Sequence, residues 1–213
     1  MATTFSFDVG TQGKVSGAIH RAAEPLQATL ILAHGAGAPR THPFMTAMAS
    51  RISRRGVDVV TFNFLYAEVG RKLPDRPELL EAAWRAAIAT VRARGGLPTE
   101  RLFIGGKSMG GRVATRIAAA REGLVIEGVV LLGYPLHALG KPHVQRREIL
   151  DVGLPMLVVQ GTRDALGTAD ELKKLLKPLG GARVLSIEGA DHSFRVPRPR
   201  SKDDPGRQER VLD

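Results

Sequence analysis

The sequence contains no cysteine. This excludes a disulfide framework and any metal site built from thiolates, and it is compatible with a reducing compartment. No apolar run approaches the roughly 18 residues that a membrane-spanning helix needs. The first residues, Met1 to Ser6, lack the basic and apolar regions of a signal peptide. We therefore expect a cytoplasmic protein that does not bind a membrane.

Aromatic residues are also scarce, at 5% of the chain, which leaves few platforms for stacking nucleic-acid bases. The formal net charge of +10 would otherwise suggest a nucleic-acid partner. Most of the basic residues are arginines spread over several predicted helix faces. We therefore expect a generally basic surface that favours anionic small molecules, and we do not favour nucleic-acid binding. The sequence gives no indication of the oligomeric state.

The length of 213 residues and a hydrophobic content of 43% are typical of one soluble globular domain. We expect that domain to span residues 1–195. Residues 196–213 are rich in proline and charge, and we expect them to form a partly mobile tail.

Strand and helix patterns alternate along the chain. The segments Phe5–Val9 and Val15–Ile19 alternate between apolar and polar residues, which predicts an antiparallel hairpin. Continuous apolar runs such as Thr29–Ala33 and Val129–Leu132 predict strands buried on both faces. Together they predict an α/β fold: a mostly parallel sheet with an N-terminal antiparallel hairpin and helices on both faces. In such sheets the functional site lies at the carboxyl ends of the strands.

Helix starts are marked by capping patterns. Asp75 with Glu78, and Thr168 with Glu171, have the spacing of a capping box. Residues 143–150 predict a further short helix.

The stretch from Leu102 to Arg112 reads as a buried strand, a tight turn and the start of a helix. Ser108 occupies the turn between Gly106 and Gly110, in the pattern G-x-S-x-G. Such a turn presents the serine hydroxyl above the sheet at a helix N-terminus. A glycine-rich turn can also hold a phosphate, but Lys107 precedes the serine at the wrong spacing for a P-loop.

A serine hydroxyl needs a base to become a nucleophile, and that base needs an acid to orient it. Asp164 and His192 follow Ser108 along the chain, each just after a predicted strand. Each of the three could instead be an ordinary loop residue, with Asp164 forming an Asx turn. Asp191 is a rival acid, although adjacent side chains on an extended segment point apart.

The chain resembles proteins of the α/β-hydrolase superfamily and is similar to small dienelactone-hydrolase-like members. More narrowly, it resembles small predicted hydrolases whose eukaryotic relatives include a subunit of the NSL histone-acetyltransferase complex. The resemblance covers roughly residues 5–195. Five stretches carry it: His34–Pro39, Gly105–Arg112, Gly133–Pro142, Gly161–Asp164 and Asp191–Phe194.

The resemblance implies a serine hydrolase that cleaves a small ester, of the carboxylesterase type, with no cofactor and no metal. Ser108 would be the nucleophile, His192 the base and Asp164 the orienting acid. Backbone N–H groups would form the oxyanion hole, contributed by Met109 and by Ala36 or Gly37. The competing interpretation is a non-catalytic binding or scaffold protein with the same fold, because fold alone does not fix function.

The substrate-binding residues are predicted from the same loops. His34 is expected to shape the loop that follows the first buried strand. Lys107 could be an ordinary solvated lysine, or it could bias the site toward anionic substrates. No long insertion follows Val129–Leu132, so we expect no lid domain and an open rim. The residues expected to form that rim are Tyr134, Leu136, His137 and Phe194.

Overall fold

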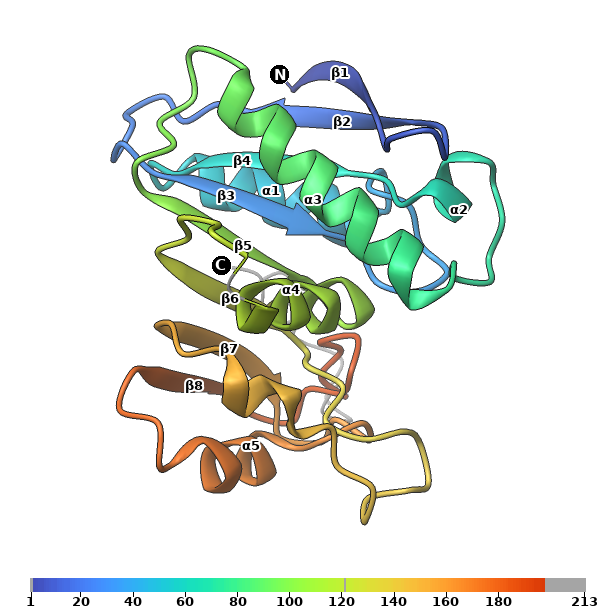
Figure 1. Ribbon diagram of the computed structural model, residues 1–213. Coiled ribbons are helices and arrows are strands. Elements are labelled where there is room, and N and C mark those ends of the chain that lie inside the picture. Colours follow the sequence, from blue (N-terminus) through green and yellow to red (C-terminus); the bar gives the residue numbers. More distant parts are fainter. Residues whose placement is uncertain (1, 121, 198–213) are drawn as a thin grey trace.

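A computed structural model describes residues 2–120 and 122–197. Eight strands form one sheet in the order β1-β2-β4-β3-β5-β6-β7-β8 (Figure 1). Their bounds are β1 Thr3–Asp8, β2 Lys14–His20, β3 Thr29–Ala33, β4 Asp58–Phe62, β5 Leu102–Lys107, β6 Gly128–Leu132, β7 Met156–Gly161 and β8 Ala182–Ile187. The expected antiparallel hairpin is confirmed, since β1 pairs with β2 and β2 pairs antiparallel with β4. From β4 to β8 all neighbouring strands are parallel.

Helices cover both faces of the sheet, as expected. Helices α3, α4 and α5 lie on the near face in Figure 1, and α1 lies behind it. The helical elements are α1 Pro43–Ser53, α2 Leu65–Glu68, α3 Pro77–Ala93, α4 Met109–Ala120, the 3₁₀ turn η1 Arg147–Asp151 and α5 Ala169–Leu176. Within the described ranges, no helix combines the length and the apolar character that crossing a bilayer takes.

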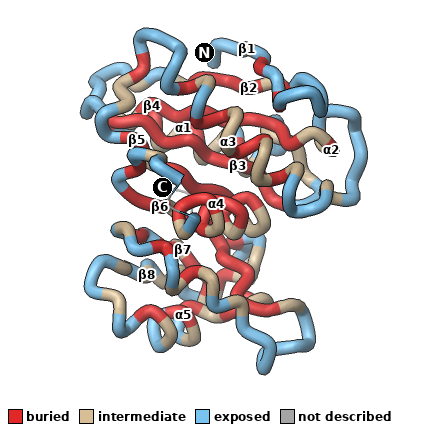
Figure 2. Tube along the Cα trace, viewed as in Figure 1, coloured by how far each residue is buried: buried red, intermediate tan, exposed pale blue. Residues whose placement is uncertain are grey.

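The core divides into two clusters because neighbouring residues of a buried strand point to opposite faces. On the α3/α4/α5 side, Ile31 of β3 shares a cluster with the fully buried Trp84 of α3. On the other side, Leu30 and Leu32 pack with Met45 of α1. Figure 2 shows the central strands buried and the margins of the sheet more exposed. The central strands therefore hold the loops at their carboxyl ends on a rigid base.

Some local expectations were wrong. Residues 143–150 do not form the expected helix, and a short 3₁₀ turn begins only at Arg147. The capping box at Thr168 and Glu171 is confirmed. Asp75 does not cap α3, because its carboxylate accepts from the Tyr66 backbone N–H and from Arg71.

The segment between β6 and β7 holds η1 and no lid domain in the part of the chain that the structure describes. Most of the expected C-terminal tail, from residue 198 to 213, lies outside the described residues.

Candidate active site

Ser108 lies in the turn between β5 and α4 with a left-handed φ of 51°. Its backbone N–H donates to the Leu132 carbonyl at 3.0 Å, and its carbonyl accepts from the Arg112 N–H at 3.0 Å. A non-glycine residue in this conformation costs of the order of 1–3 kcal/mol and persists only where the surroundings enforce it. Here β6 and the first turn of α4 enforce it. The hydroxyl is thereby presented at the carboxyl end of the sheet.

The flanking glycines allow α4 to approach the sheet this closely. A Cβ on Gly106 would lie 2.6 Å from the Ala33 carbonyl oxygen, and one on Gly110 would lie 2.5 Å from the His34 carbonyl oxygen. Both oxygens belong to the backbone at the end of β3 and cannot give way cheaply. The glycines of the G-x-S-x-G pattern are therefore required by packing.

Two further side chains meet the Ser108 hydroxyl from other loops. His192 Nε2 lies 2.9 Å from Ser108 Oγ, and His192 Nδ1 lies 2.8 Å from Asp164 Oδ2. Asp164 is 1% exposed. Because the buried carboxylate accepts the Nδ1 proton, Nε2 is left as an acceptor for the serine hydroxyl. The structure thus brings together the three residues predicted from the sequence.

The rival acid Asp191 binds backbone N–H groups of its own loop. Its Oδ1 accepts the backbone N–H groups of Ser193 and Arg195, at 2.8 and 2.9 Å. This carboxylate therefore shapes the loop that carries His192, and Asp164 is the acid that contacts the ring.

The loop after β3 is held from below by two buried side chains. His34 Nε2 accepts from the Phe64 N–H at 3.1 Å, so Nδ1 carries the proton and donates to the Gly35 carbonyl at 2.8 Å. The Tyr66 hydroxyl donates to the same carbonyl at 3.3 Å. Burial lowers the pKa of His34 to about 4, so this ring is neutral at pH 7.

These contacts orient the next peptide. The Gly35–Ala36 bond is trans, so its N–H points opposite to its carbonyl. His34 and Tyr66 hold the carbonyl, so the Ala36 N–H points away from these two side chains. Burial raises the pKa of Tyr66, and a hydrogen bond with the Gly37 backbone opposes that rise.

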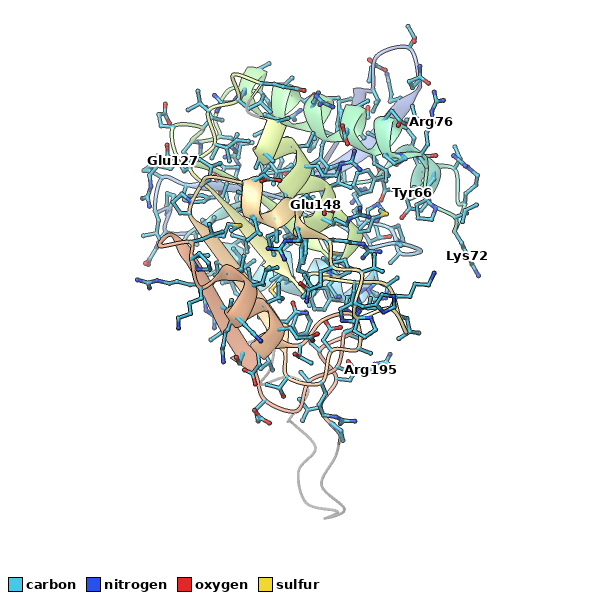
Figure 3. The ribbon with its side chains drawn as sticks, turned by 60° about the horizontal axis from the view of Figure 1, so that its bottom comes forward. Tyr66, Lys72, Arg76, Glu127, Glu148 and Arg195 are labelled. Atoms are coloured by element: carbon cyan, nitrogen blue, oxygen red, sulfur yellow. The ribbon has the colours of Figure 1, made fainter. Side chains whose placement is uncertain are left out.

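A cavity of about 490 Å³ opens beside Ser108. One wall is a stacked aromatic pair, Phe44 of α1 and Phe194, with ring centroids 5.7 Å apart and planes 7° from parallel. The residues that line the cavity are Gly35, Ala36, Ala38, His42, Pro43, Phe44, Met45, Ala47, Lys107, Ser108, His192, Ser193, Phe194 and Arg195. Figure 3 shows Arg195 on the loop that follows β8, and Tyr66 on α2.

The expected rim is only partly found. Phe194 and Lys107 line the cavity, but Tyr134, Leu136 and His137 do not. These three are at most 5% exposed, because the chain after β6 turns inward and packs beneath the site. The cavity is instead built from the N-terminus of α1, a contribution that the sequence did not indicate.

Lys107 is the cation nearest to the reacting groups. Its Nζ donates to the His192 carbonyl at 2.7 Å and lies 3.3 Å from His192 Nε2. It also lies 5.4 Å from the centre of the Phe194 ring. Burial lowers the pKa of Lys107 to about 8, although Asp164 and Asp191 oppose this.

The described residues hold no group of three or more His, Asp or Glu side chains arranged for a metal ion.

A mostly parallel sheet with a serine elbow, and with an acid and a histidine on later loops, defines an α/β-hydrolase fold. The chain belongs to the alpha/beta hydrolase domain family, whose model matches residues 26–211. The narrower likeness to the NSL-complex subunit relatives stays a prediction.

Solved structures share this fold. XC6422 from Xanthomonas campestris, described as an a/b serine hydrolase without lid, is 22% identical, with a TM-score of 0.71 over 91% of this chain and 86% of that one. Dienelactone hydrolase from Anabaena variabilis is 20% identical, with a TM-score of 0.75 over 100% and 93%. Est1E from Butyrivibrio proteoclasticus, solved with ferulic acid, is 14% identical, with a TM-score of 0.74 over 98% and 94%.

Proposed function

We propose that the protein is a serine hydrolase of the carboxylesterase type, which cleaves small esters through an acyl-enzyme. The observation that carries this proposal is the continuous hydrogen-bonded chain from Ser108 Oγ through the His192 ring to Asp164, at 2.9 and 2.8 Å. These distances fall within the range for a nucleophile activated by a general base.

Each group has a role in the reaction. Ser108 Oγ attacks the acyl carbon as His192 Nε2 takes its proton, and Asp164 stabilises the resulting imidazolium. The oxyanion accepts from the N–H groups of Met109 and Ala36. Met109 is the first residue of α4, where backbone N–H groups have no partner within the helix. The alcohol leaves with the proton from Nε2, and a water activated by His192 then releases the acid.

The cavity suits a short ester that carries a negative charge. Two cations, Lys107 and Arg195, line it, and no Asp or Glu is found among its described lining residues. Its aromatic wall offers apolar contact to a small acyl or alcohol group. We infer that a substrate with a carboxylate near the scissile bond is preferred over a neutral ester of the same size.

Labelling with a fluorophosphonate tests the nucleophile. We expect stoichiometric labelling of Ser108, located by mass spectrometry of the digested protein. Ser108→Ala should abolish labelling and lower the turnover of p-nitrophenyl butyrate by at least about 10³-fold. Its unfolding temperature should stay close to that of the wild type. Ser50→Ala, on α1, is the matched control and should label normally. Ester turnover by Ser108→Ala at the wild-type rate would contradict the proposal.

Charge preference is tested with two esters of similar size, p-nitrophenyl hemisuccinate and p-nitrophenyl butyrate. A higher kcat/KM for the anionic ester, reduced in Lys107→Met, is expected. An equal or lower value for the anionic ester in the wild type would refute the charge preference while leaving the nucleophile assignment intact.

A further inference from the structure

Gln160 is a fully buried amide near the end of β7, four residues before Asp164. Its Oε1 accepts from the Tyr134 N–H at 2.7 Å. Its Nε2 has two hydrogens and faces three acceptors: the Gly167 carbonyl at 2.6 Å, Asp164 Oδ2 at 2.9 Å and, sharing a hydrogen, the Tyr134 carbonyl at 3.2 Å. A buried amide is costly unless it is hydrogen-bonded, and this one is fully used.

The contact with Asp164 involves the atom that serves His192. Oδ2 accepts both from Gln160 Nε2 and from His192 Nδ1, while Oδ1 accepts from the Leu166 N–H at 2.8 Å. Three donors therefore converge on a carboxylate that has almost no access to water. These three hydrogen bonds fix the orientation of the carboxylate.

The same amide also joins two loops. By binding both backbone groups of Tyr134 it fixes the chain that turns inward after β6, and through Gly167 it fixes the loop that carries Asp164. A purely structural amide would need only these backbone contacts. The bond to Oδ2 is the one that reaches the chain of groups ending at Ser108.

We propose that Gln160 is a positioning residue that acts on the reaction through Asp164, by holding its Oδ2 in line with His192 Nδ1. This proposal rests on the proposed catalytic roles of Ser108, His192 and Asp164. Gln160 does not line the cavity, so its effect should appear in kcat and leave KM nearly unchanged.

Gln160→Glu gives a pH-dependent test, because the replacement has the same shape. While the new carboxyl and Asp164 share one proton, the pair carries the same charge as wild-type Asp164 and the new group still donates. When that proton leaves, two negative charges face each other at the former 2.9 Å contact and Asp164 is displaced. The ratio of the variant kcat to the wild-type kcat should therefore fall as pH rises from 6 to 9, by about tenfold per pH unit once the shared proton is lost. A ratio that is constant across this range would overturn the proposal.

A double-mutant cycle gives the second test. Gln160→Met should lower kcat by about 10- to 100-fold in the wild type, as expected for losing a hydrogen bond to a charged group. In an Asp164→Asn background the same replacement should change kcat less than about twofold. Equal losses in both backgrounds would show a general structural role and refute the proposal.

The control is Thr115→Val on α4, where Thr115 Oγ1 is buried and donates to the Arg112 carbonyl. This variant also loses a buried hydrogen bond, and it should keep the wild-type kcat and pH profile. If Ser108 does not label with fluorophosphonate, the proposed function fails. Normal labelling together with a pH-independent Gln160→Glu ratio refutes only the role of Gln160.

Discussion

Lys107→Met should change how stability depends on pH. The buried ammonium is disfavoured in the folded protein, where its pKa falls from 10.5 to about 8. At about 1.36 kcal/mol for each pH unit, that fall corresponds to about 3 kcal/mol acting against the charged form. Because the pKa is lower in the folded state, the unfolded state binds more protons between pH 8 and 10.5. The wild type should therefore gain stability as pH rises through that window, and the gain is absent below pH 8.

Methionine keeps a side chain of similar length and cannot be charged. The free energy of unfolding can be measured by urea titration, with the fluorescence of Trp84 as the signal. Between pH 7.5 and 10.5 it should rise in the wild type by up to about 3 kcal/mol more than in Lys107→Met. Lys174→Met, which removes an exposed lysine on α5, serves as the control and should follow the wild type. Parallel pH profiles for Lys107→Met and the wild type would refute the inference that this ammonium is buried at a cost.

Two further predictions concern the reaction. Tyr66→Phe removes one of the two donors to the Gly35 carbonyl, so kcat on p-nitrophenyl butyrate should fall while KM stays unchanged. The fall should be smaller than the roughly 10²-fold loss that is typical of removing a direct oxyanion donor. An unaltered kcat would contradict the role of Tyr66 in orienting Ala36. p-Nitrophenyl acetate and butyrate should have a higher kcat/KM than the laurate, because no lid domain covers the cavity of about 490 Å³ in the described part of the chain, so the far end of a long chain would extend past its apolar lining into water. A clear preference for the laurate would contradict that reasoning.

Much of the fold and the triad geometry follows from local signals. Ser108 directly follows β5, Asp164 lies three residues after the end of β7, and His192 lies five residues after the end of β8. Parallel strands bring their carboxyl ends to one edge, so position along the chain was enough to place these side chains together. Thr168 caps α5 as predicted because the cap involves only its own first turn.

Features set by distant partners were not predictable. Asp75 has a capping pattern, but Tyr66 and Arg71 engage its carboxylate. Tyr134 follows a strand end as Ser108 does, yet it turns into the core, where the Gln160 amide binds its backbone. Phe44 stacks on Phe194 although the two residues are far apart in the sequence, and no local pattern predicts this pair. Gln160 itself is a polar residue at the end of an apolar run, and the sequence pattern does not show which groups its amide binds.

The position of His192 has a consequence for how activity is lost. It follows β8, an edge strand that pairs only with β7 and is half exposed along its length. Edge elements with few buried contacts open at lower free energy than central ones. Ser108, by contrast, is fixed by β5 and β6 in the middle of the sheet. On mild heating, hydrogen exchange should therefore appear in β8 before it appears in β5 and β6, and His192 should leave Ser108 while the central strands are still paired. Loss of the contact between Ser108 and His192 would then be a local event, which cooling reverses without global refolding.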